Sequence, residues 1–388
     1  MRILHIVDGI PPATLGGTGR IVMEIAVRQL RNGESVGILS AADPEMLPKE
    51  HQGIRLLTVP RIAKRFIHFS TVFSRSREQE MLQKIKEFSP NIIHAHTISR
   101  QCGYRWMKEV KKQDIRLIVT CHDVSHVSYG KVLGNEKNLW LTEMLRYRWA
   151  WNPLRTFMIK KYLKNADVIL TVSDALKEYL LRRGIPEART VHNGIDLTYW
   201  KPAMSQLEAR EQLQLPKDRF LFLIAGRMGF DKGSTLIAAT LPENADLIIA
   251  GDNVSDEFAP VRNRMHVYKN QNAEQMKLHY SACDAVLVPS RCLDCFPTVC
   301  LEAMAMERPV LATSMGGAKE AVLEGDTGWI IDPWNESAWQ SRLLWCTEHL
   351  PELREMGKRG RSRMESTFSI ERMVDLLDTV YEKTSLHV

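Results

Sequence analysis

Apolar residues form short runs along the whole chain, and polar segments with helical spacing separate them. Short apolar runs bounded by turn residues are typical of buried strands. Between the first two runs, the spacing of Ile21, Ile25 and Leu30 predicts a helix over 20–32 that Gly33 ends. Strands that alternate with helices predict an α/β fold with parallel sheets. The predicted strands cover 3–7, 35–40, 54–59, 92–96, 117–120 and 166–172, then 220–225, 247–250, 265–268, 285–288 and 310–312.

The two series of strands predict two domains. A chain of 388 residues suits two domains of about 150 to 200 residues better than a single core. A polar connector over 200–218 separates the two series, so we expect the boundary there. The predicted domains are 1–197 and 198–365, and residues 366–388 follow as a terminal helix.

The ends of the chain and its cysteines indicate a reducing compartment. The apolar run at the N-terminus is short and stops at Asp8 and Pro11, so it predicts a first strand and no signal peptide. No apolar segment approaches the ~20 residues that span a bilayer, and we expect a cytoplasmic protein. Seven cysteines, an odd number, do not suggest a disulfide framework. Cys292-x-x-Cys295 with Cys300 has no second pair, so packed or exposed thiols are predicted over a zinc or redox site.

Charge divides the chain into a basic and an acidic half. Residues 1–200 contain 31 Lys and Arg against 19 Asp and Glu, whereas residues 201–388 contain 21 against 27. The basic half could meet an anionic membrane surface or a pyrophosphate-bearing acceptor, or it is simply solvated. Within it, segment 61–88 mixes apolar and cationic residues, as either a membrane-surface helix or a helix packed on its own sheet would.

Aromatic and cationic residues also alternate between 140 and 161. Such a mixture can bind nucleic acid, lipid headgroups or a sugar phosphate. No nucleic-acid motif accompanies it, so an acceptor site or an interface is predicted and nucleic acid is not. The residues concerned are Trp140, Arg146, Tyr147, Arg148, Trp149, Trp151, Arg155, Lys160 and Lys161.

Histidines and glycines stand where strands are predicted to end, which is where open parallel sheets bind ligands. His94 and His96 could bind a metal, but no third ligand is evident, so they are predicted to line a cleft or to be structural. Gly16 and Gly17 lie in a loop between the first strand and helix, where backbone N–H groups can approach an anion or the glycines simply make a turn.

The segment 284–320 reads as strand, polar loop, helix, strand and Gly-Gly turn. Asp294 lies in the loop and Glu302 on the helix, so two carboxylates can face one cleft and accept hydrogen bonds from sugar hydroxyls. Upstream, Gly226, Arg227 and Lys232 follow the predicted strand over 220–225. Two cations at a strand end can hold a diphosphate.

These motifs, in this order, resemble the retaining glycosyltransferases of family 4, and the resemblance covers nearly the whole chain. The family usually has Glu, seven residues and Glu, where this chain has Asp294 and Glu302 with the same gap. The other matching pieces are Gly16-Gly17, Thr120-Cys121-His122-Asp123, Ser173, Asn193-Gly194-Ile195-Asp196, Gly226-Arg227 with Lys232, and Gly316-Gly317.

The resemblance implies the GT-B fold, in which two Rossmann-like domains face each other across a cleft and the C-terminal helix crosses back to the first domain. It also implies roles for matched residues. His122 would reach the donor sugar, Arg227 and Lys232 the donor pyrophosphate, and Asp294 and Glu302 the donor hydroxyls. The glycines of the first loop would lie near donor phosphate and acceptor. The remaining implied donor contacts are Gly16, Gly17, Gly226, Phe296 and Thr298.

The function implied is a retaining transfer of sugar from a nucleotide-diphosphate sugar to a surface-polysaccharide or lipid-linked acceptor. No Asp-x-Asp occurs in the chain, so cations are expected in place of a metal, and no cofactor is predicted. Asp294 in place of Glu, and Pro297 where the family often has Gly, predict altered sugar specificity. The alternatives are a nucleotide-sugar epimerase or phosphorylase on the same fold and a non-catalytic nucleotide-sugar-binding protein.

Overall fold

The computed structural model describes residues 1–383 apart from 15, 44, 135–138, 148–150, 186, 253 and 255. Contacts between residues divide it into two compact units. The first unit contains the chain up to Val132, the following segment that ends at Gly194, and the C-terminal stretch from Ile370. The second unit contains Ile195–Ser369 together with Leu133 and Gly134.

The first unit is built on an eight-stranded sheet in the order β3-β4-β2-β1-β5-β6-β7-β8. Every neighbouring pair is parallel except β3 with β4. Strand order reverses between β1 and β5, whose carboxyl ends therefore flank a topological switch point. The strands are β1 (Arg2–Val7), β2 (Ser35–Ala41), β3 (Glu50–His51), β4 (Ile54–Val59), β5 (Ile92–Ala95), β6 (Arg116–Cys121), β7 (Val168–Thr171) and β8 (Arg189–Thr190).

Helices connect these strands, and side-chain caps begin several of them. Ser74 accepts from the backbone N–H of Arg77 at the start of α3, and Ser173 accepts from that of Leu176 at the start of α7. The helices of the first unit are α1 (Gly17–Arg31), η1 (Lys64–Phe66), α2 (Ile67–Phe73), α3 (Arg75–Phe88), α4 (Met107–Val110), η2 (Val124–His126), α5 (Leu139–Tyr147), α6 (Pro153–Leu163), α7 (Asp174–Arg182) and α15 (Ile370–Lys383).

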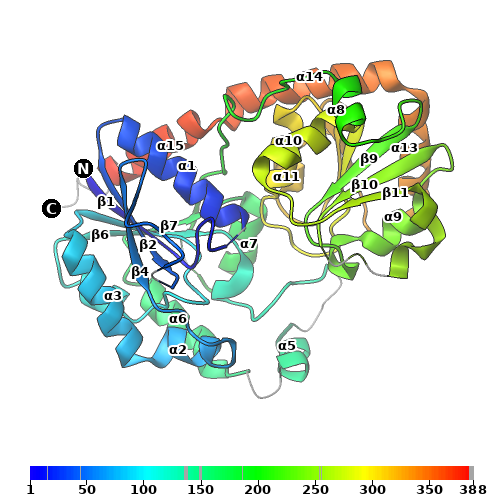
Figure 1. Ribbon diagram of the computed structural model, residues 1–388. Helices are drawn as coiled ribbons and strands as arrows, with labels where there is room; N and C mark the ends of the chain where they lie inside the picture. Colours follow the sequence, from blue (N-terminus) through cyan, green and yellow to red (C-terminus); the bar gives the residue numbers. More distant parts are fainter. Residues whose placement is uncertain are drawn as a thin grey trace. The chain divides into compact units, whose positions relative to one another are not determined.

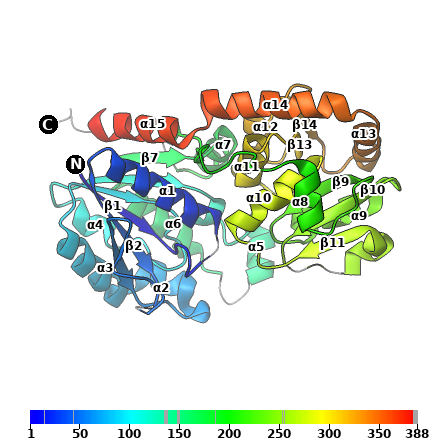
Figure 2. The same ribbon diagram turned by 45° about the horizontal axis from the view of Figure 1, so that its top comes forward.

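The C-terminal helix α15 packs on α1 of the first unit, beside which it lies in both views (Figures 1 and 2). Arg28 of α1 forms an ion pair of 3.7 Å with Glu371, and the buried Tyr381 hydroxyl accepts a hydrogen bond from Gln29. The chain after Gly194 is therefore not all in one unit, since the residues from Ile370 on return to the fold of the N-terminal segment. The predicted terminal helix starts at 370 rather than at 366, because α14 continues to Thr367.

The second unit has a six-stranded parallel sheet in the order β11-β10-β9-β12-β13-β14. Its strand order reverses between β9 and β12. The strands are β9 (Phe220–Ala225), β10 (Ala245–Ala250), β11 (Met265–Tyr268), β12 (Ala285–Val288), β13 (Val310–Thr313) and β14 (Gly328–Ile331). The helices are α8 (Gln206–Gln212), η4 (Phe230–Lys232), α9 (Ser234–Thr240), η5 (Asp256–Arg264), α10 (Ala273–Ala282), α11 (Thr298–Ala305), α12 (Ala318–Ala321), α13 (Glu336–Glu348) and α14 (Leu350–Thr367).

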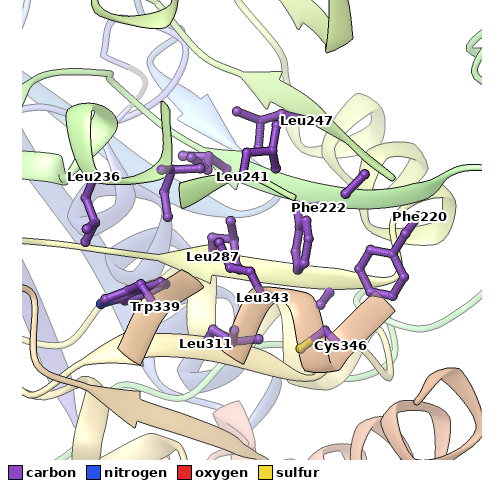
Figure 3. Close-up of a cluster of buried hydrophobic side chains, with 14 of the residues drawn as sticks. Phe220, Phe222, Leu236, Leu241, Leu247, Leu287, Leu311, Trp339, Leu343 and Cys346 are labelled. Atoms are coloured by element: carbon purple, nitrogen blue, oxygen red, sulfur yellow. The ribbon is translucent and has the colours of Figure 1, made fainter. Parts of the chain in front are cut away.

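Apolar side chains on one face of this sheet form its core with α13. Figure 3 shows Trp339, Leu343 and Cys346 of α13 against Leu287 of β12 and Leu311 of β13. A parallel sheet that helices cover on both faces requires strands that are apolar on both faces. The short apolar runs of the sequence form these strands. Burying a side chain of this size stabilises the fold by roughly 1.5–3 kcal/mol.

No helix in the described part of the chain is long and apolar enough to cross a membrane.

Candidate active site

In the second unit, the loops after β9 and β12 carry the predicted cations and carboxylates. They follow neighbouring strands at the point where strand order reverses, which is the usual ligand position in an open parallel sheet. Gly226, directly after β9, has a φ of 104°, in the region that favours glycine. Its carbonyl oxygen would lie 1.7 Å from a Cβ placed on Gly251, so the loops after β9 and β10 meet backbone to backbone.

Lys232 ends the short helix η4, and its ammonium group forms an ion pair with Asp294. Burial disfavours the charged form of Lys232, but the attraction and hydrogen bond of Asp294 outweigh this and raise its pKa. Arg227 is exposed and close enough to Lys232 for its charge to oppose that rise. The structure thus brings the two predicted cations into electrostatic range of each other and of one predicted carboxylate.

The Asp294 loop is held from two sides. The Asp294 carboxylate accepts a hydrogen bond of 3.0 Å from the Ser290 hydroxyl, and its carbonyl oxygen accepts one of 2.9 Å from Gly317 N–H. Gly316 has a φ of 108°, and a Cβ there would lie 2.1 Å from the Asp294 carbonyl oxygen. The predicted Gly-Gly turn therefore serves to seat the acidic loop, because only glycine admits this approach.

Glu302 lies in the middle of α11 and is almost fully buried, with 4% of the residue exposed. The Tyr280 hydroxyl donates a hydrogen bond of 2.8 Å to its Oε2. The buried Cys300 thiol reports how close the charged groups are. Burial raises its pKa most, Asp294 and Glu302 raise it further, and Lys232 lowers it. The carboxylate pair and the lysine thus lie within electrostatic range of one thiol, with Asp294 on the loop and Glu302 on the helix.

The other predicted contacts in this unit differ in accessibility. Phe296 is buried and packs against Phe368 with ring centroids 5.7 Å apart, so the structure gives it a packing role. Thr298 is half-buried and begins α11, directly after Pro297. Pro297 stands at the N-cap position of α11, immediately before its first turn.

In the first unit, His122 follows β6 and lies among buried polar rings. Its Nε2 is 3.0 Å from Nδ1 of His96, which follows β5. Burial lowers the pKa of His122 to about 4, with Asp123 acting in the opposite direction. Gly16 and Gly17, also in this unit, are exposed at the start of α1. The glycine that the fold needs is Gly19, whose Cβ would lie 2.4 Å from the Gly9 carbonyl oxygen.

Sequence reasoning missed several polar residues near these strand ends, among them the partly buried Asp8 and the buried His5. Asp8, after β1, accepts from the backbone N–H groups of Arg100, Gln101 and Cys102 at 2.7–2.8 Å. His5 lies within β1 beside His96, although no third histidine near the His94–His96 pair was foreseen. The signal was present, since a histidine inside an apolar strand must find a buried partner.

The cysteines are free and buried, as the predicted absence of a disulfide framework requires. Of the aromatic and cationic residues between 140 and 161, Arg148 and Trp149 lie outside the described residues, as do the side chains of Trp140 and Tyr147. Arg155 is buried, with its guanidinium group 4.7 Å from the Tyr129 ring centroid and donating to the Ser125 carbonyl oxygen. Arg155 therefore belongs to the interior of the unit.

Two family models match consecutive parts of the chain. The model described as Glycosyltransferase Family 4 matches residues 15–199, and the model described as Glycosyl transferases group 1 matches residues 205–363. The two matches meet in the predicted polar connector. Together they cover the loops that carry every predicted site residue.

Curated relatives and solved structures are similar over most of the chain. A glycogen synthase of Mycobacterium tuberculosis (strain CDC 1551 / Oshkosh) is 24% identical over 98% of this chain and 94% of that protein. A D-inositol 3-phosphate glycosyltransferase of Mycobacterium bovis (strain BCG / Pasteur 1173P2) is 28% identical over 76% of this chain and 62% of that protein.

Among solved structures, sucrose-phosphate synthase of Thermosynechococcus elongatus superimposes with a TM-score of 0.80 at 21% identity, covering 98% of both chains. Anabaena HepE in complex with UDP-glucose superimposes with a TM-score of 0.73 at 16% identity, covering 98% of this chain and 99% of that one. At these sequence identities, the superpositions are evidence for the fold alone.

Proposed function

Because the chain belongs to the group 1 glycosyltransferases, we propose that it transfers a sugar from a nucleotide-diphosphate sugar, with retention of anomeric configuration and without a metal. The two parallel-sheet units and the solved structures that match them confirm the predicted GT-B fold. The single observation that carries the proposal is the cluster of Arg227, Lys232 and Asp294 at the strand-order reversal of the second unit.

The cations of this cluster suit the leaving group. Breaking the bond between the anomeric carbon and the phosphate oxygen leaves negative charge on the nucleoside diphosphate. Lys232 and Arg227 are positioned by a strand end before any substrate binds, and such preorganised charges stabilise a departing phosphate without reorganisation. A bound diphosphate would compete with Asp294 for the Lys232 ammonium group. Side-chain cations then take the place that a divalent metal has in other transferases.

The carboxylates suit the sugar and the ribose. Glu302 is fixed by its helix and by the Tyr280 hydroxyl, so its charge is available in one orientation. Asp294 is on the loop seated by Gly316 and Gly317. Both accept hydrogen bonds from hydroxyls, and Thr298 with Gly226 extends the donor site. We assign His122 to contact with the donor sugar, and Gly16 and Gly17 to contact with the donor phosphate.

Retention follows in this proposal from attack on the same face that the diphosphate leaves. The bond from the acceptor oxygen to the anomeric carbon forms as the bond to phosphate breaks, and the acceptor proton passes to the departing phosphate oxygen. No side chain has to become covalently attached. The acceptor we propose is a surface polysaccharide or a lipid-linked glycan.

A lipid-linked acceptor favours a membrane-surface location, and α2 and α6 have the side chains for it. These helices contact each other in the first unit (Figure 1). Both leave large apolar side chains exposed. Phe69 of α2 is 62% exposed and Phe157 of α6 is 63% exposed. Lys64 and Arg65 precede α2, and Lys160 and Lys161 lie on α6. We propose that this surface contacts anionic lipid headgroups.

The test uses the purified chain with a panel of nucleotide sugars. A ligand that binds only the folded state raises the unfolding temperature, so thermal shifts identify the donor. Release of nucleoside diphosphate, without and then with glycan acceptors, measures turnover. We expect Lys232→Ala to lower kcat/KM by about 100- to 1000-fold, the usual loss for one preorganised charge.

The matched control is Lys217→Ala, because Lys217 also forms an ion pair, of 2.6 Å with Glu211, but is exposed and away from the strand-order reversal. It should keep wild-type turnover. Thermal shifts with no diphosphate release under any condition would identify a binding protein instead of an enzyme. Equal rates for Lys232→Ala and wild type would refute the assignment of the leaving-group site.

A further inference from the structure

Four buried side chains in the first unit form one line of hydrogen bonds that ends at His122. Oε1 of Gln29 on α1 is 2.7 Å from Nε2 of His5, and Nδ1 of His5 is 3.0 Å from Nε2 of His96. Nδ1 of His96 is in turn 3.0 Å from Nε2 of His122. Gln29, His5 and His96 have no exposed surface, and 8% of His122 is exposed. Four places in the fold contribute to this line: α1, β1, and the ends of β5 and β6.

Each imidazole in the line carries a single proton. Burial lowers the pKa of His5 and of His122 to about 4 and that of His96 well below 6.5. A neutral imidazole has one N–H donor and one bare nitrogen acceptor, so each ring can pass a hydrogen bond in only one direction. The direction of the whole line is therefore set wherever one member is fixed.

Gln29 fixes the direction. Its Oε1 can only accept, so Nε2–H of His5 donates to it and Nδ1 of His5 is left as an acceptor. His96 must then donate from Nε2 to His5 and accept at Nδ1. His122 accordingly donates from Nε2 to His96, which leaves its Nδ1 without a proton. Among the described residues, Nδ1 of His122 has no hydrogen-bond partner. Solvent can reach this atom, because it is not one of the fully buried side-chain atoms that lack a partner.

The C-terminal helix holds the Gln29 amide in the required orientation. Nε2 of Gln29 donates a hydrogen bond of 3.3 Å to the hydroxyl of Tyr381 on α15. That hydroxyl is 2.7 Å from Nδ1 of His94, and Nε2 of His94 is 2.7 Å from the Thr120 hydroxyl. With the Tyr381 hydroxyl oxygen accepting from Gln29, its proton is available for Nδ1 of His94, and Nε2–H of His94 then donates to the Thr120 hydroxyl.

The same histidines have a spacing that suits a metal, since ligand atoms of His5, His94 and His96 lie within 4.8 Å of one another. Each of their ring nitrogens already has a protein partner. Gln29 and His96 bond His5, Tyr381 and Thr120 flank His94, and His5 and His122 flank His96. Binding a metal would break several of these buried hydrogen bonds. The arrangement therefore favours a line of hydrogen bonds over a metal site.

We propose that Gln29, His5 and His96 are positioning residues that hold His122 as the tautomer with its proton on Nε2 and its Nδ1 free to accept. The inference rests on the proposed function, in which His122 meets the donor sugar. An unprotonated nitrogen there accepts a hydrogen bond from a sugar hydroxyl. It stays an acceptor throughout the neutral pH range, whereas a protonated or reversed ring would present an N–H donor to that hydroxyl and would reverse the hydrogen bond.

The test reads the tautomer directly. The chain is labelled with ¹⁵N-histidine, and long-range correlations between ring nitrogens and carbon-bound protons are recorded at neutral pH. The His122→Asn variant identifies the His122 signals by their absence. We expect His122 to show a protonated Nε2 and a bare Nδ1. A wild-type His122 with its proton on Nδ1, or signals of His5, His94 and His96 that change when EDTA is added, would overturn the proposal.

Two variants separate the line from general packing. Gln29→Met removes the group that fixes direction, so His122 should show a mixture of tautomers and kcat/KM for the donor should fall about tenfold, the effect of one hydrogen bond. Tyr104→Phe is the control, because Tyr104 has its hydroxyl 2.9 Å from Nδ1 of His126, a buried histidine outside the line. It should leave the His122 spectrum unchanged.

The outcomes also separate this proposal from the function on which it rests. His122 with a protonated Nε2 in a protein that turns over no nucleotide sugar would support the line and reject the function. Turnover with an unchanged His122 spectrum in Gln29→Met would reject the line and keep the function. If Gln29→Met does not fold, the wild-type tautomer alone still decides.

Discussion

At the scale of single residues, the site depends on charges that are held in place by neighbours with no chemistry of their own. Glu302 is buried and receives a hydrogen bond from the Tyr280 hydroxyl. Lys232 keeps its charge although it is largely surrounded by protein, because Asp294 is its partner. Removing a charged group, and removing the side chain that supports it, should therefore affect turnover and stability differently.

Glu302→Gln should lower kcat/KM by about 100-fold or more, because the amide keeps the shape of Glu302 but not its charge. Its free energy of unfolding should change by at most about 1 kcal/mol, since the amide oxygen still accepts from Tyr280.

Tyr280→Phe should instead destabilise the fold by about 1–3 kcal/mol, because one buried carboxylate oxygen loses a donor. Its kcat/KM should fall by less than tenfold. Urea unfolding and initial rates measure the two quantities on the same samples. Equal losses of turnover in both variants would show that orientation of Glu302, and not its charge, limits the reaction.

At the scale of elements, the chemistry lies on loops after strands and the support comes from helices distant in sequence. The loops after β9 and β12 are neighbours because the strands are, and the loop after β13 contributes the glycines that seat the acidic loop. In the first unit, α15 closes on α1 and reaches the histidines through Tyr381. Helices α2 and α6 have no such internal role for their exposed apolar residues.

The exposed residues of α2 and α6 should bind anionic membranes. In flotation, the wild-type chain should rise with phosphatidylglycerol-containing vesicles and much less with phosphatidylcholine vesicles, because both apolar insertion and cations contribute. The double variant Phe69→Ser and Phe157→Ser should lower the bound fraction several-fold. Leu344→Ser, at an exposed leucine of α13, is the control and should bind like wild type. Equal binding of all three would refute the lipid surface.

At the scale of the whole molecule, buried neutral histidines link stability to pH. Burial lowers the pKa of His5, His122 and His126 to about 4 and that of His94 and His96 well below 6.5. In the unfolded chain each returns to about 6.5. The unfolded state therefore binds more protons between these values, and stability is lost as pH falls from about 6.5 towards 4.

Urea unfolding should give a lower midpoint at about pH 5.5 than at about pH 7.5. Each such histidine contributes about 1 kcal/mol of this loss. Asp8 and Asp378 act in the opposite direction, because burial raises their pKa to about 6 and protonation then favours the folded state. These two carboxyls are outweighed by the five histidines above together with His68 and His279, whose pKa burial also lowers to about 4. A midpoint that rises on acidification would contradict the neutral state of the histidines.

The sequence by itself determined the elements and the order of the motifs. Short apolar runs become strands because a parallel sheet covered by helices buries both faces, and that local requirement is legible in residues such as those of β9 and β12. The positions of Lys232 and Asp294 in loops after strands, and of Glu302 on a helix, predict that these residues belong to the site. The strand order, with β9 beside β12, then brings them into range of one another.

Only the tertiary structure decided the partners. Tyr280 for Glu302, and Gln29 with Tyr381 for the histidines, come from positions up to 352 residues apart, and no local pattern encodes such a pairing. His5, His96 and His122 become one line because β1, β5 and β6 are neighbours in the sheet. Burial then decides their charge, because a ring sealed from water keeps one proton and must share it with the next.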